Sequence, residues 1–496
     1  MRIDRRDFLR QSVILGGGLS LSRPSDLFAV GTPGSATRPN IIFIVADDQG
    51  YGDFSCHGNP VLKTPNLDAL RSESVSFTDY HGSPVCSPSR CALLTGRHEF
   101  RSGVSQTRGP SQQMLLSAIT LPEVLKSAGY TTGIFGKWHL GLGEAYWPSN
   151  RGFDEMLTFL TGMIGEFLHD TSIDPILLRK SINDPTASLE KIKGYYTDIF
   201  FDQAMAWINS VKSDTRPFYA YIPTGAVHAP VNMPPGYGNS MYNNAVPDPA
   251  LCTYFDMVAN LDDNVGKLLA YLKSSGLDRN TIVVYTGDNG AASTAAGFGK
   301  RFQPSEFFNA GMKGGKNTVD EGGTRLANFW RCPSLLQGGV EVDRLTSNID
   351  FLPTVVELAG ATLPAKLLPD GSSPLDGRSL VPLLKNPKAQ WEDRYIFIHS
   401  MGWGGPAANQ QGRGYAVRNN QFRLLRGTAT AGLYDIKAGD RGEKDNVSNQ
   451  AGNPALIADM EAAYAKWWPT VLPALQEVEN TPVQDLAPIL SHLPKK

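Results

Sequence analysis

NIIFIVADD, residues 40–48, is the stretch of sequence on which the fold prediction depends. Its apolar part, Asn40–Ala46, is an uninterrupted run rich in β-branched side chains, which is typical of a strand buried on both faces of a sheet. The same pattern occurs in three later segments, at residues 130–135, 217–222 and 280–285. The sequence therefore predicts four fully buried strands.

Segments with apolar residues at helical spacing lie between these strands, for example at residues 121–128 and 256–274. Strands that alternate with helices predict an α/β fold with a large, mostly parallel or mixed sheet flanked by helices. After about Trp391 the sequence changes to shorter, more polar strand-like pieces, followed by a helical segment at about 454–468. These pieces predict a smaller C-terminal α+β unit with strands at 395–399, 415–417, 422–425 and 433–435.

The N-terminal residues resemble a twin-arginine export signal. Arg5 and Arg6 precede a short, glycine-containing apolar stretch that is too short for a membrane-spanning helix. A basic cytoplasmic N-terminus is the alternative interpretation. Export through the twin-arginine translocon implies a periplasmic or secreted location, and we expect no stable membrane span elsewhere. The predicted organisation is a signal peptide at 1–31, a spacer at 32–38, a catalytic domain at 39–390, and a C-terminal antiparallel sheet with a terminal helix at 391–496.

The charge balance argues against a general attraction to nucleic acid or to anionic membranes, because 46 basic side chains are matched by 48 acidic ones. Any anionic substrate would therefore have to be bound by a local group of cations. The five cysteines form no CxxC pair and no Cys/His cluster with zinc spacing, so we expect no disulfide framework. Four of them are predicted to be small buried apolar residues: Cys56, Cys91, Cys252 and Cys332.

Chemically reactive side chains follow each of the four predicted strands. Because ligands of open α/β sheets bind beyond the carboxyl ends of the strands, we expect these side chains to converge on one site. They are Asp47 and Asp48 after the first strand, Lys137 and His139 after the second, His228 after the third, and Asp288 and Asn289 after the fourth.

The carboxylates of Asp47, Asp48 and Asp288 and the amide oxygen of Asn289 form an all-oxygen set suited to a hard cation. In an extended strand the first two side chains would point to opposite faces, but both can turn toward one ion where the strand ends. An isolated pair of this kind is more often a solvated turn or a helix cap. Here both pairs end apolar strands, which favours a metal site.

Residues 86–96, CSPSRCALLTG, contain the predicted nucleophile. Ser87 is a predicted N-cap, Pro88 suits the first helical position, and the closing glycine would end the helix. Cys86 would then lie beside a helix N-terminus, whose unpaired N–H groups attract anions, and Arg90 would add a positive charge nearby. Taken alone, the segment also fits a buried cysteine before a capped helix.

CSPSR at 86–90 followed by LTG at 94–96 resembles the signature of the formylglycine-dependent sulfatases, which are arylsulfatase-like members of the alkaline-phosphatase superfamily. The resemblance extends from residue 40 to about 384, and more weakly through the C-terminal unit. Its further motifs, in family order, are DDQGYG at 47–52, TPNLD at 64–68, GKWHLG at 136–141, TGDNG at 286–290, GK at 315–316 and EGG at 321–323.

The resemblance implies an alkaline-phosphatase-like fold and a cysteine, Cys86, that a maturation enzyme oxidises to formylglycine (3-oxoalanine). It also implies that Asp47, Asp48, Asp288 and Asn289 bind Ca²⁺, with Mg²⁺ as the alternative, and that the modified residue completes the metal ligands.

The resemblance further implies roles for five cationic or titratable residues. Lys137 and Lys316 would bind the sulfate group, and Arg90 would favour the ionised hydrate of the aldehyde. His228 would protonate the leaving alcohol, assisted by Lys316, and His139 would remove the proton of the second hydroxyl during sulfate release. The place of Lys316 rests on resemblance, because its glycine-rich loop, 311–323, follows no clear strand.

The resulting prediction is a sulfuric ester hydrolase that acts on a sulfated small molecule or glycan. A formylglycine-type phosphate or phosphonate ester hydrolase is the nearest alternative, and a catalytically silent glycan-binding protein is another. No substrate-contacting residue is predicted between 152 and 196, where no motif matches. Trp403 fits either stacking on a sugar ring or packing in the core, and Arg418 fits a role in stabilising the C-terminal sheet.

Overall fold

The strand predicted at Asn40–Ala46 is β1, at the centre of the main sheet, where every residue after Asn40 is fully buried. β1 pairs in parallel with β8 (Phe218–Pro223) on one side and with β9 (Thr281–Gly287) on the other. β4 (Thr131–Lys137) pairs in parallel with β8. All four predicted strands are therefore confirmed, and the order β9-β1-β8-β4 places their carboxyl ends along one edge of the sheet.

The computed structural model describes residues 38–167, 171–234, 242, 245–246, 248–292, 307–483 and 485–495. The predicted signal peptide at 1–31 and residues 32–37 of the predicted spacer lie outside these ranges. Arg38–Lys496 form one compact unit, and the boundary between residues 390 and 391 stays a prediction.

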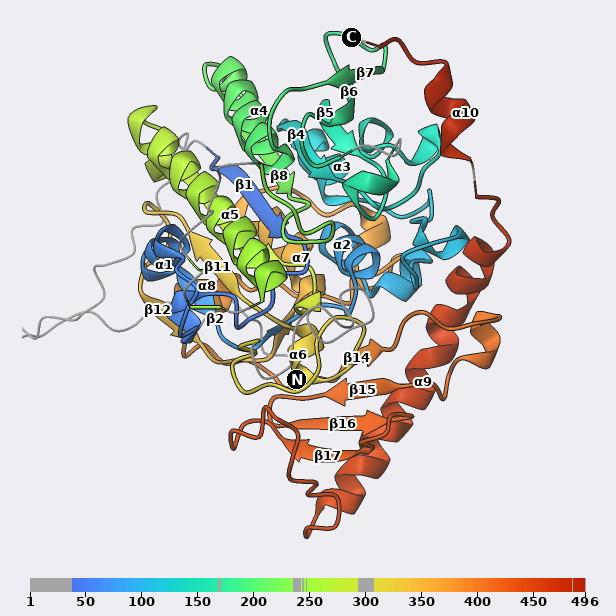
Figure 1. Cartoon of the computed structure of the whole chain (residues 1–496). Helices are drawn as coiled ribbons and strands as arrows, with labels where there is room; N and C mark the ends of the chain where they lie inside the picture. The colour runs from blue at the N-terminus through green and yellow to red at the C-terminus, as the bar shows by residue number, and fades with distance from the viewer. Residues whose placement is uncertain are drawn as a thin grey trace, which may run out of the picture. The chain divides into compact units, whose positions relative to one another are not determined.

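The main sheet is mixed and has ten strands in the described part of the chain (Figure 1). β5 (Glu155–Phe159) continues the parallel set beside β4. The edge strands are β6 (Ile176–Ser181) and β7 (Ser188–Lys191) beyond β5, and β11 (Asn328–Arg331), β2 (Val75–Phe77) and β12 (Val340–Val342) beyond β9. A small second sheet contains β10 (Arg325–Leu326), β3 (Tyr80–His81) and β13 (Thr346–Ser347). The predicted α/β fold with a large mixed sheet is confirmed.

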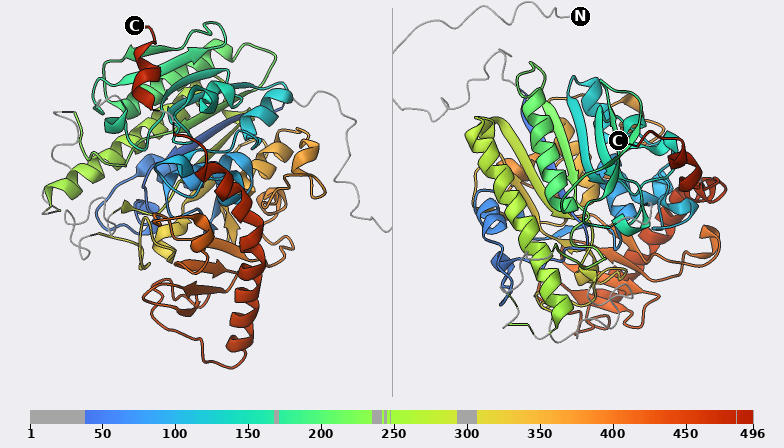
Figure 2. Two further views of the ribbon diagram at one scale, coloured as in Figure 1. Left: turned by 90° about the vertical axis from the view of Figure 1, so that its right-hand side faces the viewer. Right: turned by 45° about the horizontal axis from the view of Figure 1, so that its top comes forward.

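Helices cover both faces of the main sheet, as Figures 1 and 2 show. On one face α4 (Tyr196–Val211) and α5 (Pro249–Ser274) lie side by side, with α1 (Pro65–Ser72) next to α5. The other face carries α2 (Cys86–Thr95), α3 (Leu121–Ser127), α7 (Phe351–Leu358) and the short α8 (Val381–Lys385).

Helix α5 begins at Pro249, earlier than the predicted residue 256. The carboxylate of Asp248 accepts hydrogen bonds from the N–H groups of Ala250 and Leu251, and proline occupies the first helical position. Both features favour a helix start. An N-cap carboxylate accepts hydrogen bonds from N–H groups that lack an intrahelical partner, and proline has no N–H that would need such a partner.

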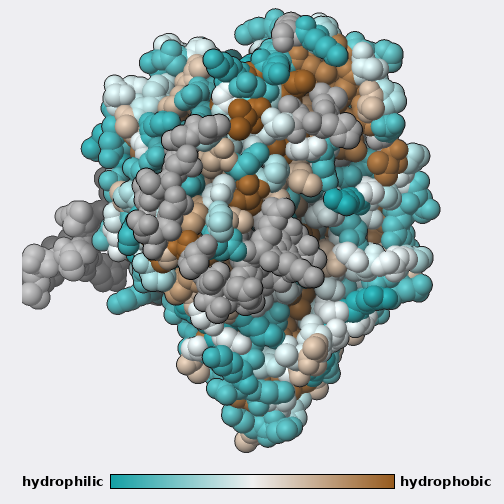
Figure 3. Space-filling model, viewed as in Figure 1, coloured by the Kyte–Doolittle hydropathy of each residue, from teal (hydrophilic) through white to brown (hydrophobic). Residues whose placement is uncertain are grey.

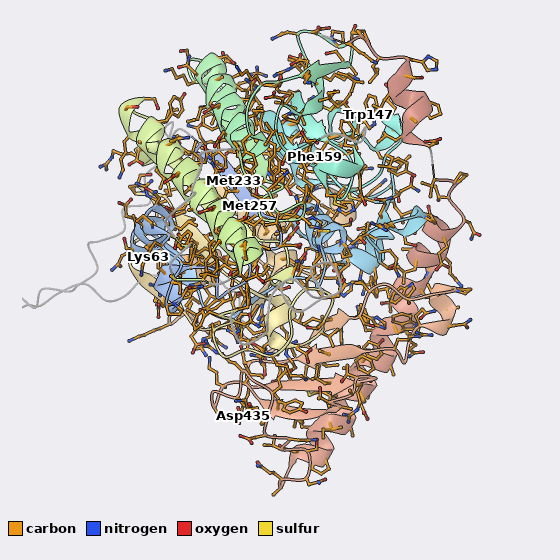
Figure 4. All side chains as sticks on the ribbon, viewed as in Figure 1. Lys63, Trp147, Phe159, Met233, Met257 and Asp435 are labelled. Atoms are coloured by element: carbon orange, nitrogen blue, oxygen red, sulfur yellow. The ribbon has the colours of Figure 1, made fainter. Side chains whose placement is uncertain are left out.

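The C-terminal unit is a four-stranded antiparallel sheet covered by a long helix, as predicted. Its strands are β14 (Ile396–His399), β15 (Tyr415–Arg418), β16 (Phe422–Arg426) and β17 (Gly432–Asp435). Figure 4 shows Asp435 in this sheet, well away from Phe159 at the end of β5. On the side viewed in Figure 3 the described surface of this unit is mainly hydrophilic, and apolar side chains form separate patches.

Helix α9 (Asn453–Glu479) extends beyond the predicted segment at 454–468, although Pro469 and Pro473 lie inside it. Proline disfavours a helix interior because it removes an N–H and crowds the preceding turn. The helix continues because apolar side chains beyond the first proline, such as Val471 and Leu475, remain buried in the C-terminal core. After α10 (Leu486–Ser491) the chain returns to the main sheet, where the N–H of Leu189 donates to the carbonyl of Pro494 over 2.8 Å.

All five cysteines are free thiols. Cys91, Cys252 and Cys332 are buried, as predicted, but the prediction is wrong for Cys56, which is half-buried. Cys56 lies in a single helical turn at the surface, and its N–H donates to the Asp68 carboxylate over 3.0 Å. In the described ranges no helix is long and apolar enough to cross a membrane.

Buried ion pairs join the C-terminal sheet to the main unit. Arg418 of β15 lies 3.1 Å from a carboxylate oxygen of Asp79, and Arg423 of β16 lies 2.7 Å from one of Glu321, which begins α6 (Glu321–Thr324). Arg325 pairs with both acids, over 2.8 and 2.7 Å. Burial acts to raise the pKa of Asp79 and of Glu321, but the arginines outweigh it and hold both well below their usual values. Arg418 therefore has the stabilising position that the sequence indicated.

We expect Arg423→Met to lower the free energy of unfolding by about 3–5 kcal/mol, because it leaves the buried Glu321 carboxylate without one of its cations. Arg426→Met is the matched control, since Arg426 lies on the same strand but pairs with a half-exposed Glu461. Its effect should stay below about 1 kcal/mol. Urea unfolding of both variants measures the difference. Equal decreases in the free energy of unfolding would contradict a stabilising role for the buried Arg423–Glu321 pair.

Candidate active site

The carboxyl ends of the buried strands converge, as predicted. Lys137, the last residue of β4, donates from Nζ to Oδ2 of Asp47 over 2.7 Å, and Asp47 directly follows β1. Arg90 of α2 donates from Nε and Nη2 to Oδ2 of Asp288 over 3.0 and 2.8 Å, and Asp288 directly follows β9. All four side chains are fully buried.

A third ion pair joins Lys316 to Asp48, with Nζ 2.8 Å from a carboxylate oxygen. The loop that carries Lys316 also contacts the turn before Cys86, because the N–H of Asn317 donates to the carbonyl of Pro84 over 2.8 Å. The structure thus brings to the site the lysine that the sequence placed by resemblance alone.

The pKa values depend on how burial and ion pairing balance at each group. Burial raises the pKa of Asp47 well above its usual value, although Lys137 opposes the shift. Burial also acts to raise the pKa of Asp48, but Lys316 and His228 outweigh it and hold that pKa below its usual value. Nearby positive charge therefore opposes the effect of burial at both groups, and it outweighs burial only at Asp48.

Two residues of the site have an unusual backbone conformation. Asp48 and His139 both have a φ of 61°, in the left-handed region that residues other than glycine rarely adopt. At Asp48 this turn lets the N–H donate to Oδ1 of Asp288 over 3.1 Å. It also lets two consecutive aspartates reach the same site, as the sequence required.

A glycine permits the close approach of two strands just before the site. Gly136 has a φ of 136°, and a Cβ there would lie 2.0 Å from the carbonyl oxygen of Pro223 in β8. Any other residue would force β4 and β8 apart and displace Lys137.

The predicted metal residues fit a hard cation. Ligand atoms lie within 4.8 Å of one another in two overlapping groups, Asp47 with Cys86 and Asp288, and Asp47 with Asp48 and His228. Asn289 donates from Nδ2 to Oδ1 of Asp48 over 2.8 Å. Oδ1 of Asn289 and Oδ1 of Asp47 are buried and accept no hydrogen bond from the described residues. Buried oxygen atoms without a hydrogen-bond donor suit a cation that prefers oxygen ligands.

The prediction that Ser87 caps helix α2 is wrong. The helix begins at Cys86, its N-cap is the extended residue Val85, and Gly96 ends it in the left-handed conformation. Instead, the hydroxyl of Ser89 accepts from the N–H of Ser83 over 2.8 Å and orders the turn before the helix. Cys86 is consequently the first helical residue, at the helix N-terminus whose free N–H groups attract anions.

His139 lies beside the cysteine, with Nδ1 3.3 Å from Sγ of Cys86. Its Nε2 lies 2.9 Å from the carbonyl oxygen of Thr107, which can only accept, so Nε2 carries the proton and Nδ1 is free to take one. Burial, reinforced by Lys137, holds the pKa of His139 well below its usual value, so the ring is neutral.

His228 lies beside Asp48, with Nε2 3.6 Å from Oδ2 of that carboxylate. Its Nδ1 donates to the carbonyl of Ala229 over 2.8 Å, which leaves Nε2 unprotonated in the neutral ring. Burial and Lys316 lower the pKa of His228 to about 3. An incoming anion would counteract the effect of Lys316 and raise this pKa.

Sequence reasoning missed the residues that surround His139. Thr107 contacts it through a backbone carbonyl, and a Cβ at Gly162 would lie 3.0 Å from its ring. Neither belongs to a motif, and only the Gly109-Pro110 pair signalled a turn in this region. Trp403 is half-buried and packs against Phe100, His399 and Trp468, which favours the core interpretation over an exposed stacking platform.

Comparisons with known proteins agree with this arrangement. The model of the Sulfatase family matches residues 39–361, and the model "N-sulphoglucosamine sulphohydrolase, C-terminal" matches residues 316–467. N-acetylgalactosamine-6-sulfatase of Rattus norvegicus is 32% identical over 397 residues, which cover 75% of this chain and 70% of the relative. Arylsulfatase A of Homo sapiens is 31% identical over 484 residues, which cover 90% and 83%.

A solved structure has the same fold across nearly the whole chain. It is described as "Crystal structure of Ps i-CgsB in complex with k-i-k-neocarrahexaose", is 28% identical, and covers 91% of this chain and 96% of its own with a TM-score of 0.72. Because the family model matches residues 39–361 and both relatives are more than 30% identical over at least 70% of their own length, the chain belongs to the sulfatase family and hydrolyses sulfuric esters.

Proposed function

We propose that this sulfatase removes sulfate from a sulfated carbohydrate, with a formylglycine made from Cys86 and a Ca²⁺ ion bound by Asp47, Asp48, Asp288 and Asn289. The observation that carries the proposal is the position of Cys86, which lies within 4.8 Å of ligand atoms of Asp47 and Asp288 and 3.3 Å from Nδ1 of His139. The carbohydrate is favoured because N-acetylgalactosamine-6-sulfatase is among the relatives and the Ps i-CgsB structure contains an oligosaccharide.

The modification and the metal supply the chemistry that a thiol lacks. A hydrated aldehyde offers two hydroxyls on one carbon, one to attack sulfur and one to expel sulfate afterwards, and a bound dication favours ionisation at this position. Nδ1 of His139, which lies 3.3 Å from Sγ of Cys86, would accept the proton of the second hydroxyl. A serine or cysteine ester would have no such internal route to release sulfate.

The cations of the site have separate tasks in this proposal. Lys137 and Lys316 would attract the equatorial oxygens of the ester, while Arg90 holds Asp288 from the side of α2. Nε2 of His228 would donate a proton to the leaving alcohol, with Lys316 nearby. His228 must first become protonated, which the arrival of the anionic ester favours.

The proposed location is outside the cytoplasm, in the periplasm or the medium. Support for it comes from the twin-arginine pattern alone. Cell fractionation with Arg5→Lys/Arg6→Lys as the control tests it, because loss of both arginines blocks recognition by the translocon.

We expect Cys86→Ala, made alongside a formylglycine-generating enzyme, to lower turnover of 4-nitrophenyl sulfate by on the order of 10⁴-fold, because the nucleophile is lost. Cys91→Ala is the matched control on the same helix, since Cys91 is buried outside the site. Mass spectrometry of the wild-type peptide should reveal an aldehyde at position 86.

An unmodified thiol at position 86 in protein from the native host would indicate the silent glycan-binding alternative. Faster turnover of 4-nitrophenyl phosphate or a phosphonate ester than of 4-nitrophenyl sulfate would indicate the other alternative, a phosphate or phosphonate ester hydrolase.

Calcium should raise the thermal unfolding temperature of protein treated with a chelator, since a ligand at about 100 times its Kd adds about 2.7 kcal/mol to the free energy of unfolding. Asp47→Asn should abolish this increase. Asp53→Asn should keep it, because Asp53 is buried nearby but accepts from the Gly50 N–H and the Tyr254 hydroxyl and lies outside the proposed ligands. A larger increase with Mg²⁺ than with Ca²⁺ would favour magnesium.

A further inference from the structure

The rim of the site beside His139 is built from two loops that carry no family motif. One is the turn at residues 105–111, which is closed by hydrogen bonds from the N–H groups of Ser105 and Gln106 to the carbonyl of Ser111, over 2.9 and 3.1 Å. The other is the segment at 161–167 that follows β5. The first turn is further held by Gln106, whose Oε1 accepts from the N–H of Gly402 over 2.7 Å.

Both loops lie next to the proposed catalytic histidine. The carbonyl of Thr107 lies 2.9 Å from Nε2 of His139. A Cβ at Gly162 would lie 3.0 Å from Cε1 of His139 and 3.2 Å from Oε2 of Glu166, so one methyl group would bridge the imidazole and the carboxylate. The carboxylate of Glu166 is therefore close to the imidazole of His139, whose Nδ1 lies 3.3 Å from Sγ of Cys86.

An ion pair joins the two loops at this point. Nη2 of Arg108 donates to Oε1 of Glu166 over 2.9 Å. The side chain of Arg108 is 80% exposed and that of Glu166 33% exposed, whereas the cations deeper in the site are buried. Among the described residues, the remaining nitrogens of Arg108 have no partner, so donors and an acceptor are presented together to solvent.

We infer that Arg108 and Glu166 form a carbohydrate subsite that binds two neighbouring hydroxyl groups of the sugar that carries the sulfate ester. The inference rests on the proposed function and names its substrate class more closely. A hydroxyl both donates and accepts, so one can donate to the carboxylate while its neighbour accepts from the guanidinium. In the bound substrate the sulfur of the sulfate ester must lie next to Cys86. The sugar to which the ester is attached would then extend toward the rim.

The charges of the pair select hydroxyls over a second anion. The guanidinium and the carboxylate cancel each other, and a second sulfate or a uronate carboxylate would be repelled by Glu166 as much as it is attracted by Arg108. Burying the pair under a neutral sugar leaves no unpaired charge, because each ion keeps its partner and gains a hydrogen bond. An aryl sulfate has no hydroxyls to offer and gains nothing from the subsite.

The experiment compares substrates with and without sugar hydroxyls. Wild-type enzyme, Glu166→Gln and Arg108→Gln are assayed with 4-nitrophenyl sulfate and with a panel of sulfated monosaccharides, namely the 6-sulfates of galactose, glucosamine and N-acetylgalactosamine and the 4-sulfate of galactose. Arg216→Gln is the matched control. It removes an exposed arginine that pairs with Asp214 over 3.5 Å. Arg216 precedes β8 and therefore lies at the amino end of that strand, whereas the site lies at the carboxyl ends.

For the best sugar substrate, we expect each rim variant to lower kcat/KM by about 10- to 100-fold, as expected when a hydrogen bond to a charged group is lost. Turnover of 4-nitrophenyl sulfate should change less than about 2-fold, which also shows that the variants fold. Arg216→Gln should change neither.

Three results would overturn the inference: equal losses on the aryl and sugar sulfates, no loss on the sugars, or wild-type turnover of the aryl sulfate but of no sugar in the panel. Inactivity of the formylglycine-containing wild-type enzyme on every sulfate ester would instead contradict the proposed function itself.

Discussion

The rest of this structure depends on burying three carboxylates beside three cations at one edge of a sheet. The distance from nitrogen to carboxylate oxygen is at most 2.8 Å in each of three pairs: Lys137 with Asp47, Arg90 with Asp288 and Lys316 with Asp48. Removing such charges from water costs several kcal/mol per ion, and the attraction offsets that cost only when the geometry is held rigidly. Parallel strands buried on both faces provide this rigidity, because the sheet hydrogen bonds determine where each strand ends.

When all three carboxylates are ionised, this arrangement is balanced in charge before any ligand arrives. A dication bound to the carboxylates would leave an excess of positive charge in a buried place, and an anionic ester together with an ionised nucleophile would neutralise it. In the proposed mechanism, binding of the metal, binding of the ester and ionisation of the nucleophile would therefore be coupled through electrostatics. The left-handed turns at Asp48 and His139 indicate that local backbone strain is accepted in order to keep these side chains in place.

The sequence predicted the parts of this site that follow strands, since an apolar β-branched run marks a buried strand and the next residues then lie at its end. It did not predict contacts that depend on tertiary structure. The loop of Lys316 is held by the C-terminal unit, where Arg423 donates to the carbonyl of Val319 and Glu443 accepts from the N–H of Glu321 over 3.0 Å. The first helical residue of α2 was missed because Ser89, rather than Ser87, orders the preceding turn.

The residues proposed for catalysis and those proposed for substrate specificity differ in the same way. Strand ends and the start of α2 hold the groups that are proposed to react. Their positions follow from the sheet, so family motifs identify them. The rim consists of the loops at 105–111 and 161–167, whose positions depend on contacts with His139 and Gly402 that no local pattern encodes. Loops of this kind can change without disturbing the buried ion pairs. Substrate preference can therefore diverge among sulfatases of one fold while the three carboxylate–cation pairs stay the same.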